Sequence, residues 1–299
     1  MLTGISVAII GGDARQLEVI DQLSDLDASV TLVGFDELKS ERKGLIRSEL
    51  HRELCKNLDV LILPVIGTDD VGQVGTLFSN QQIIIKEEHI EALPQHVKIY
   101  TGLAKPYLKS LAHTHHIEVI ELFDRDDVAI YNSIPTAEGA IMMAIQHTDI
   151  TIHRSTCIVL GMGRTGMTLA RLLQALGAQV KVGVREAADY ARAWEMNLQP
   201  FYITSLYDEA NKIDLLFNTI PTMIVTAQII AHIPLHAIII DLASHPGGTD
   251  FRYAEKRGIK AMLAPGLPGI VAPKTAGRII ATTISRLIHE DFIYRGTAL

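Results

Sequence analysis

Short apolar runs rich in β-branched residues alternate along this chain with longer stretches whose apolar residues recur every three or four positions. An unbroken apolar run is typical of a strand buried on both faces, and the longer amphipathic stretches are typical of helices. The runs of the first half lie at 5–10, 29–35, 58–65, 97–102 and 117–122. Those of the second half lie at 157–161, 179–184, 213–220, 237–243 and 258–264. Alternating strands and helices predict parallel sheets with helices on both faces.

The two series predict an α/β protein with two doubly wound, Rossmann-like parallel-sheet domains. Between the series, Pro135 suits the first turn of a helix, and we expect a helix over 135–148 that joins the domains. The apolar spacing from Pro273 onward predicts a final helix that folds back across the first domain. These two interdomain helices would leave a cleft between the lobes. The expected domains are residues 1–134 with 274–299, and residues 135–273.

The composition of the 299-residue chain argues against several classes of protein. With 48% apolar and 20% charged residues it has the profile of a folded globular protein. Its net charge of -7 argues against a general nucleic-acid binder, which needs a basic surface. We expect no membrane span and no signal peptide, because we find no long apolar run and no basic leader. Cys55 and Cys157 lack the spacing of metal ligands, so we expect a reduced cytoplasmic protein without a metal site.

A glycine motif in the second half follows an apolar run and opens a helical stretch. Gly161 permits a tight turn, Gly163 leaves room for a pyrophosphate against the backbone, and Gly166 lets helix and strand pack closely. The N-terminus of the helix supplies amide donors to the phosphates. The motif therefore predicts a dinucleotide site in the second domain, with Arg164 and Thr165 in the same turn.

The residue that would meet the ribose selects between the two nicotinamide dinucleotides. It is Arg185, nineteen residues after Gly166, where NAD-binding proteins place an acid. An arginine there favours a 2′-phosphate, and Arg164 adds a second cation. We predict NADP as the cofactor. The alternative is that Arg185 stacks on the adenine and that NAD also binds.

Later loops of the second domain also follow strands, where ligands bind in open α/β sheets. Thr219 and Pro221 could line the ribose and nicotinamide, and Asp241 begins the next such loop. In that loop His245 is the histidine we would test as a proton donor or acceptor. A loop rich in proline and glycine then leads to Lys274 near the start of the last helix. The second domain is thus the expected NADP-binding domain, and the first is the expected substrate domain.

The first domain has a turn with two glycines, Gly11 and Gly12, but lacks the third glycine of a dinucleotide motif. We therefore expect no second dinucleotide. Arg15 and Gln16, which begin the following helix, could instead hold an anionic substrate. The alternative for Arg15 is an ordinary surface contact.

A polar segment precedes the predicted bridging helix. Arg125 offers a bidentate partner for a carboxylate, unless neighbouring aspartates already pair with it. Asn132 and Ser133 lie where a substrate could be contacted. A carboxylate in a half-buried cleft can have a raised pKa and accept a proton, which makes Glu138 our first candidate base and Asp127 our second. Solvation or helix capping is the alternative role for each.

Five stretches, in this order and spacing, resemble the A-subunit family of dipicolinate synthase over essentially the whole chain. They are GGDARQ, RDDVAIYNSIPTAEG, GMGRTGM, DLASHPGGTDF and APGLPGIVAPKTAG. The resemblance implies NAD(P)-dependent oxidation of a dihydrodipicolinate-type intermediate of the lysine pathway to dipicolinate. It also implies sporulation, the cytoplasm of the mother cell, and a partner in the flavoprotein-like B-subunit of dipicolinate synthase. A dicarboxylate substrate calls for cations, for which Arg15, Arg125 and Lys274 are candidates.

Other functions stay open beside this one. A D-2-hydroxyacid dehydrogenase shares the two-domain layout, but the loops at 241–250 and 264–277 lack the arginine and histidine that it needs. A methylene-tetrahydrofolate or shikimate dehydrogenase type is an equal alternative. A different class is a nucleotide-binding scaffold whose chemistry takes place only with its partner. A homo-oligomer is compatible with each.

Overall fold

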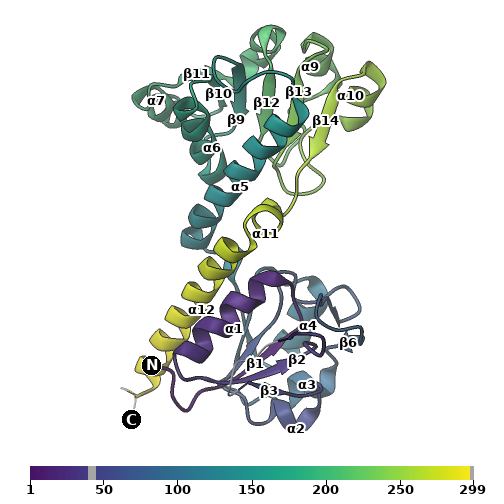
Figure 1. Cartoon of the computed structure of the whole chain (residues 1–299), viewed down its shortest axis with the longest axis vertical. Helices are drawn as coiled ribbons and strands as arrows, with labels where there is room; N and C mark the ends of the chain where they lie inside the picture. The colour runs from purple at the N-terminus through teal and green to yellow at the C-terminus, as the bar shows by residue number, and fades with distance from the viewer. Residues whose placement is uncertain (40–44, 297–299) are drawn as a thin grey trace. The chain divides into compact units, whose positions relative to one another are not determined.

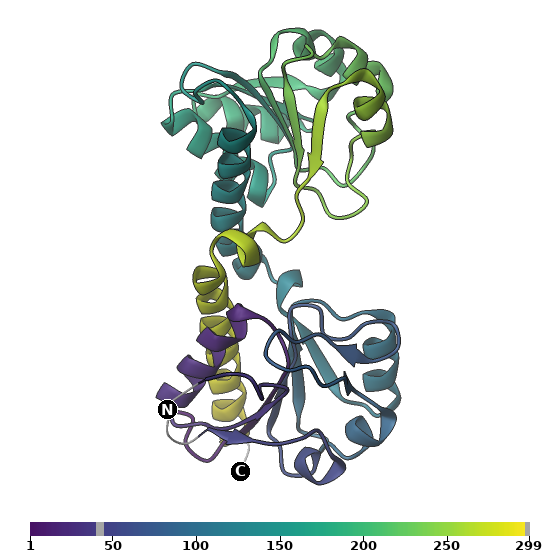
Figure 2. The same ribbon diagram turned by 45° about the vertical axis from the view of Figure 1, so that its right-hand side comes forward.

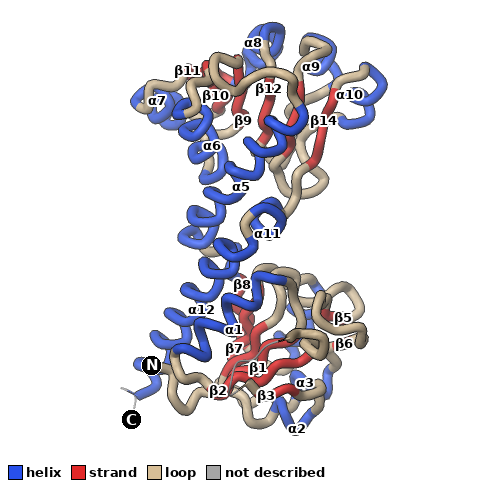
Figure 3. The backbone as a smooth tube through the Cα atoms, viewed as in Figure 1, coloured by secondary structure: helices blue, strands red, loops and turns tan. Residues whose placement is uncertain are grey.

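The computed structural model describes residues 1–39 and 45–296. The chain divides into two units, one formed by Met1–Ala129 with Pro273–Leu299 and the other by Ile130–Ala272. The predicted division lay at 134/135 and 273/274, and residues 297–299 of the predicted final helix lie outside the described residues. Each unit contains its own parallel sheet, drawn in red in Figure 3.

The sheet of the first unit has the strand order β3-β2-β1-β4-β7-β8, and every pairing in it is parallel. Its strands are β1 (Ser6–Ile10), β2 (Ser29–Val33), β3 (Ile46–Arg47), β4 (Val60–Ile62), β7 (Lys98–Thr101) and β8 (Glu118–Glu121). A separate antiparallel pair is formed by β5 (Gln73–Val74) and β6 (Ile83–Ile84). The helices are α1 (Ala14–Asp25), α2 (Arg52–Cys55), α3 (Glu87–Glu91), α4 (Pro106–Thr114) and α12 (Pro273–Gly296), with a 3₁₀ turn at Leu122–Asp124.

The last helix, α12, belongs to the first unit. It lies beside α1 in both ribbon views (Figure 1, Figure 2). Ile280, Ile284 and Ile288 of α12 share one apolar core with Val19 and Leu23 of α1. Burial of such side chains stabilises the pair by roughly 1.5–3 kcal/mol each. The described part of the tail therefore packs on the first unit, which is where the periodicity predicted it.

The sheet of the second unit has the order β11-β10-β9-β12-β13-β14, again with parallel pairings. Its strands are β9 (Thr156–Leu160), β10 (Gln179–Val184), β11 (Gln199–Tyr202), β12 (Leu215–Asn218), β13 (Ile238–Asp241) and β14 (Lys260–Leu263). The helices are α5 (Asp126–His147), which belongs to this unit from Ile130 onward, α6 (Arg164–Ala175), α7 (Ala187–Glu195), α8 (Leu206–Glu209), α9 (Ala227–His232), α10 (Phe251–Arg257) and α11 (Leu267–Val271). Two 3₁₀ turns lie at Ile203–Ser205 and Ala210–Lys212.

Both sheets reverse their strand order beside their first strand, which is the doubly wound arrangement. The predicted fold class is confirmed. The reversal lies between β1 and β4 in the first unit and between β9 and β12 in the second. In such sheets ligands bind outside the carboxyl ends of the strands at this point. For the second unit that is the turn between β9 and α6.

The helix predicted over 135–148 begins nine residues earlier, at Asp126, as α5. Pro135 therefore lies inside the helix and not in its first turn, which corrects the prediction. The acidic residues Asp126 and Asp127 form the first turn, where the helix dipole favours negative charge. Pro135 cannot donate to the carbonyl four residues back, yet it is buried, and packing retains it within the helix. The division between the units falls within α5.

None of the helices in the described part of the chain is long and apolar enough to cross a membrane.

Candidate nucleotide site in the second unit

Two glycines of the turn between β9 and α6 are required by close packing. Gly161 has φ of +98°, in the left-handed region that favours glycine, and a Cβ there would lie 2.5 Å from Oγ1 of Thr219. A Cβ on Gly166 would lie 2.1 Å from the carbonyl oxygen of Gly161. The helix thus approaches the strand as closely as the motif predicts.

The middle glycine faces open space. A Cβ on Gly163 would meet nothing within 4 Å. Gly163 is also the N-cap residue of α6, and among the described residues no side chain caps this helix. The first turn of α6, which includes Arg164 and Thr165, presents backbone N–H groups at a helix N-terminus, and such groups suit an oxyanion. The turn fits the pyrophosphate of a dinucleotide.

Arg185 follows β10 and is exposed. Its Nη2 donates to Oγ1 of Thr222, 3.1 Å away, in the loop after β12. This hydrogen bond orients the guanidinium at the carboxyl edge of the sheet, next to the switch point. A cation held there suits a phosphate on the adenosine ribose.

Asp241 at the end of β13 is fully buried and anchors the loop that follows it. Its Oδ1 accepts hydrogen bonds from Nδ2 of Asn218 (3.1 Å) and the amide of Ala243 (3.0 Å). Its Oδ2 accepts from the amide of Gly248 (2.8 Å) and from Oγ1 of Thr249 (2.7 Å). Both oxygens are thus satisfied inside the protein. Asp241, which the sequence predicts to contact the cofactor, instead supports the loop from beneath.

The loops after β12 and β13 are joined to each other. The amides of Ile224 and Val225 both donate to the carbonyl of Gly248 at 2.9 Å. A Cβ on Gly248 would lie 2.4 Å from the carbonyl oxygen of Thr222, so only glycine fits between the two loops. The joined loops carry Pro221 and His245, which are exposed at their surface. Half-buried Thr219 donates from Oγ1 to the carbonyl of Leu160 at 2.8 Å.

The glycine turn of the first unit differs, because the chain itself covers it. The amide of Gly12 donates to the carbonyl of Gly75, and the amide of Leu77 donates to the carbonyl of Gly12, each at 2.8 Å. A Cβ on Gly11 would lie 2.7 Å from the carbonyl oxygen of Gly75. Asp13 caps α1 by accepting from the amide of Arg15 at 2.9 Å. The space used by phosphate in a dinucleotide fold is therefore filled here by residues 75–77 and by Asp13.

Arg15 and Gln16 do not form the predicted anion site. Arg15 makes a bidentate ion pair with Asp13, with Nε to Oδ1 at 2.9 Å and Nη2 to Oδ2 at 2.5 Å. Burial on its own raises the pKa of Asp13, but the hydrogen bonds and charge of Arg15 outweigh burial and leave that pKa below its usual value. Gln16 is buried, and its Nε2 donates to the carbonyl of Leu63 at 3.2 Å. The polar groups of both side chains are therefore bound to Asp13 and to the carbonyl of Leu63.

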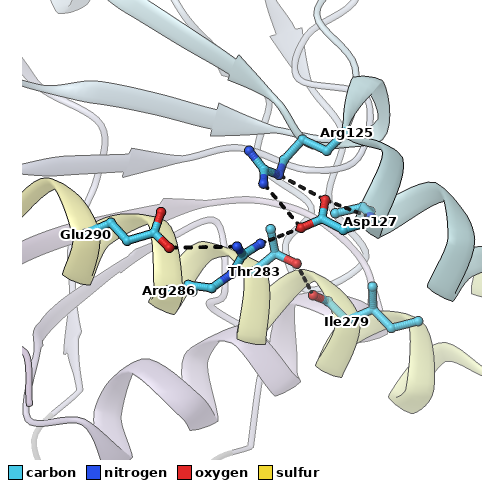
Figure 4. A network of polar contacts seen from close by, with 7 residues as sticks. Arg125, Asp127, Ile279, Thr283, Arg286 and Glu290 are labelled. Carbon is cyan, nitrogen blue, oxygen red and sulfur yellow. Dashed lines mark hydrogen bonds and ion pairs between the residues drawn. The ribbon is translucent and has the colours of Figure 1, made fainter.

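Arg125 and Asp127 likewise pair with each other, as Figure 4 shows. Nε of Arg125 lies 3.1 Å from Oδ1 of Asp127, and Nη2 lies 3.2 Å from Oδ2. Arg286 of α12 donates to the same carboxylate and also faces Glu290 at 3.7 Å. Hydrogen bonds from Arg125 are the largest cause of a lowered pKa at Asp127, against the opposing effect of burial. A carboxylate with a lowered pKa is a poor proton acceptor, so Asp127 is withdrawn as a base.

The three remaining residues predicted to bind substrate differ in their burial and in their partners. Ser133 is buried, with Oγ 2.6 Å from the carbonyl of Ile130 and 2.7 Å from Oγ1 of Thr168, so it ties α5 to α6 instead of facing a ligand. Asn132 is half-buried, and its Oδ1 is a buried oxygen without a hydrogen-bond partner in the structure. Lys274 is exposed in the first turn of α12.

Glu138 is exposed on α5, beside Leu172 of α6. Leu172 is eight residues into that helix, roughly 12 Å from its N-terminus at 1.5 Å per residue. Glu138 thus lies along the helices and away from the glycine turn before α6. We do not retain it as the first candidate base.

Two residues of this region have structural roles that the sequence did not predict. Asn218 is fully buried at the end of β12, and its side chain binds both Ile220 and Asp241. A polar residue ending an apolar run was a usable signal for it. Thr222, the partner of Arg185, had no such signal, because its role depends on how the loop folds.

Comparison with known proteins places the chain in a family. The family model for the N-terminal domain of the dipicolinate synthase A-subunit matches residues 6–123. The dipicolinate synthase A-subunit of Bacillus subtilis (strain 168) is 51% identical over 290 residues, covering 97% of this chain and 98% of that protein. The chain belongs to the dipicolinate synthase A-subunit family.

Two crystal structures of dipicolinate synthase A-subunits agree closely with the fold. The one from Bacillus halodurans has a TM-score of 0.93 and 53% identity, and covers 96% of this chain and 98% of that chain. The one from Bacillus subtilis has a TM-score of 0.95 and 50% identity, with 98% and 99% covered. D-lactate dehydrogenase of Escherichia coli, at 13% identity and a TM-score of 0.60 over 96% and 97% of the chains, shares the fold alone. The family thus shares the two-domain fold of that protein.

Proposed function

We propose that this chain oxidises a dihydrodipicolinate-type intermediate of the lysine pathway to dipicolinate during sporulation. NADP is the proposed hydride acceptor, and the flavoprotein-like B-subunit of dipicolinate synthase is the proposed partner. The observation that carries the proposal is an uncapped glycine turn before α6 in a member of the dipicolinate synthase A-subunit family. That turn suits a dinucleotide, and the conversion of a dihydropyridine to a pyridine needs a hydride acceptor.

The residues of the second unit would hold the nucleotide in distinct ways. The amides at the start of α6 bind the pyrophosphate above Gly163. Arg185, oriented by Thr222, binds the 2′-phosphate with a charge-assisted hydrogen bond. Thr219 and Pro221 line the ribose and nicotinamide. When bound, NADP supplies the two-electron acceptor, and the protein supplies orientation and proton transfer.

Three of the residues predicted from the sequence remain candidates for proton removal and substrate binding. His245 is exposed on the loop that Asp241 anchors, so its imidazole is the proposed proton acceptor. Lys274 is the proposed cation for one substrate carboxylate, since Arg15 and Arg125 already pair with aspartates. Asn132 is a second substrate candidate because of its unpartnered oxygen. Lys274→Ala should raise KM for the dicarboxylate with a smaller change in kcat.

Calorimetric titration with NADPH, NADP+, NADH and NAD+ tests the cofactor assignment. The wild-type chain should bind the 2′-phosphorylated pair more tightly. Arg185→Ala should weaken that binding by roughly 1.5–3 kcal/mol, the typical worth of a hydrogen bond to a charged group. Binding of NAD(H) should change little. If the variant loses both pairs equally, Arg185 acts by stacking on adenine and the preference for NADP is wrong.

The role of the B-subunit needs a separate assay. Reduced nicotinamide is followed by absorbance in three samples: this chain, the isolated partner, and a mixture of the two. Turnover by this chain without its partner would show that the chain itself carries out the oxidation. The partner would then regulate this activity or channel its substrate. Turnover only in the mixture, while the isolated chain binds NADP(H), would support a shared site. Nucleotide binding without turnover in any sample would favour the scaffold alternative.

A further inference from the structure

Helix α5 is apolar on two opposite faces. Its inner face is buried and consists of the small residues Ser133, Ala137, Ala140 and Ala144. Its outer face carries large apolar side chains that stay exposed, namely Tyr131, Ile134, Met142 and Ile145. Large apolar side chains that gather on one exposed helix face mark an interaction surface.

Part of the outer face forms a groove with α6. The groove has a volume of about 460 Å³. Its apolar lining comes from Ile141, Met142 and Ile145 of α5, from Leu172 and Ala175 of α6, and from Leu176, the C-cap residue of α6. Met142 is 37% exposed, Leu176 44% and Ile145 58%, so the hollow and the protruding side chains have the same apolar chemistry. A groove between two helices with such a lining accepts the apolar face of a third helix.

The polar residues of the groove indicate which helix fits. Glu138 and Gln146 complete its lining, and each lies four residues from Met142 along α5. If an identical helix crosses antiparallel over Met142, Glu138 of each copy meets Gln146 of the other. The amide of each glutamine then donates to a carboxylate, and two-fold symmetry makes the contact twice. A self-complementary surface of this kind is what an isologous dimer requires.

We propose that the groove between α5 and α6 is the interface of a two-fold homodimer, occupied by α5 of a second copy of this chain. Helices α5 and α6 of both copies then pack together, and the exposed side chains of Met142, Ile145 and Leu176 are buried in each copy. The interface lies on the helices and leaves the nucleotide turn before α6 accessible. The proposal does not depend on the identity of the cofactor or substrate.

A charge exchange tests the pairing of Glu138 with Gln146 in the full-length protein. Sedimentation velocity should show a dimer for the wild type. Gln146→Glu places two carboxylates opposite each other twice, and should raise the dimer dissociation constant by roughly tenfold or more. The double variant Glu138→Lys with Gln146→Glu replaces each repulsion by an ion pair, and should restore dissociation to about the wild-type level.

Position 142 tests the crossing point directly. Because Met142 lies at the proposed two-fold axis, a Met142→Cys variant should cross-link to its own copy with a short bis-maleimide. The native cysteines Cys55 and Cys157 are both buried, so the new thiol is the accessible one among the described residues. Cross-linking should disappear when Ile145→Asp is added.

Leu235 provides a matched control. It is 64% exposed in the same unit but does not line the groove. Ile145→Asp should give a monomer, whereas Leu235→Asp should leave the dimer intact, with both variants shown to be folded by circular dichroism. The proposal is overturned if the wild type is a monomer at about 100 µM, a concentration at which even a weak complex forms. It is equally overturned if the double charge variant fails to restore the dimer, which would point to another surface or partner.

Discussion

At the scale of single residues, Gly163 and Gly166 separate folding from ligand binding within one turn. A methyl group at 166 would meet the Gly161 carbonyl at 2.1 Å, whereas one at 163 meets nothing. Gly166→Ala should therefore lower the free energy of unfolding by at least about 2 kcal/mol. Gly163→Ala should lower it by less than about 1 kcal/mol, the typical difference between the two residues at an N-cap.

For nucleotide affinity the order of the two effects should be reversed, with the larger change in Gly163→Ala. The Gly163 methyl would project into the space assigned to the pyrophosphate, raising Kd for NADP(H) by at least about tenfold in a well-folded protein. Urea denaturation measures the first effect and calorimetric titration the second. Unchanged nucleotide affinity in Gly163→Ala would show that the phosphates lie elsewhere.

Glycines such as Gly161 and Gly166 can be predicted from the sequence, because the backbone geometry admits only glycine at these positions. The spacing of Gly161, Gly163 and Gly166 reports a backbone requirement. Residue spacing does not show in the same way which partner a charged side chain binds. Arg15 and Arg125 have the chemistry of carboxylate binders, yet each binds an aspartate two residues away in sequence. For Arg125 the sequence allowed both a substrate carboxylate and a neighbouring aspartate as partner, and the side-chain rotamers decide between them.

At the scale of elements, the apolar runs identify the central strands because those strands are buried on both faces. The edge strands β3 and β11 were not predicted, because they lack an unbroken apolar run. Both are short or polar, and β11 contains Pro200, which only an edge strand or bulge tolerates readily. The start of α5 was misplaced because Pro135 has the features of a first-turn residue. Burial in the unit overrode that local preference.

The start of α5 is attached to α12 by a cluster whose contribution depends on pH. Arg125 and Arg286 both bind Asp127 and lower its pKa below the ordinary 3.8. A group with a lowered folded pKa stabilises the protein above its unfolded pKa, and this contribution is lost as pH falls through the folded value. Asp127→Asn should therefore cost stability near neutral pH, by up to about 1 kcal/mol because the pair is partly exposed.

Urea titrations of wild type and Asp127→Asn from neutral pH down to acid check this dependence. The difference in unfolding free energy should stay constant near neutral pH and shrink once the pH falls below about 4, where the unfolded carboxyl takes up its proton. Asp126→Asn, one residue away, is the control for loss of charge in the first turn of the helix. A difference that grows on acidification would contradict the assigned pairing.

At the scale of the whole molecule, each unit has its own apolar cores. The clusters built on β9, β10 and β12 contain residues of the second unit, and those built on β1, β2 and β4 contain residues of the first, including α12. Two repeated series of strands make this division predictable from the sequence. The exact boundary was not, because it falls inside a continuous helix where composition does not change.

Separate cores lead to a prediction about heat denaturation. Scanning calorimetry should resolve two transitions, and NADP(H) should raise the midpoint of only the one that belongs to the second unit, since the ligand binds that unit when folded. At one hundred times Kd the stabilisation is about 2.7 kcal/mol, or roughly 8 °C for a domain of this size. Arg185→Ala should reduce the shift by NADP(H) while leaving both transitions in place without ligand. Trp194 on α7 in the second unit is the only tryptophan in the chain, so its fluorescence identifies which transition moves. If the other transition moves instead, the nucleotide binds the first unit, and the open turn before α6 is not the site.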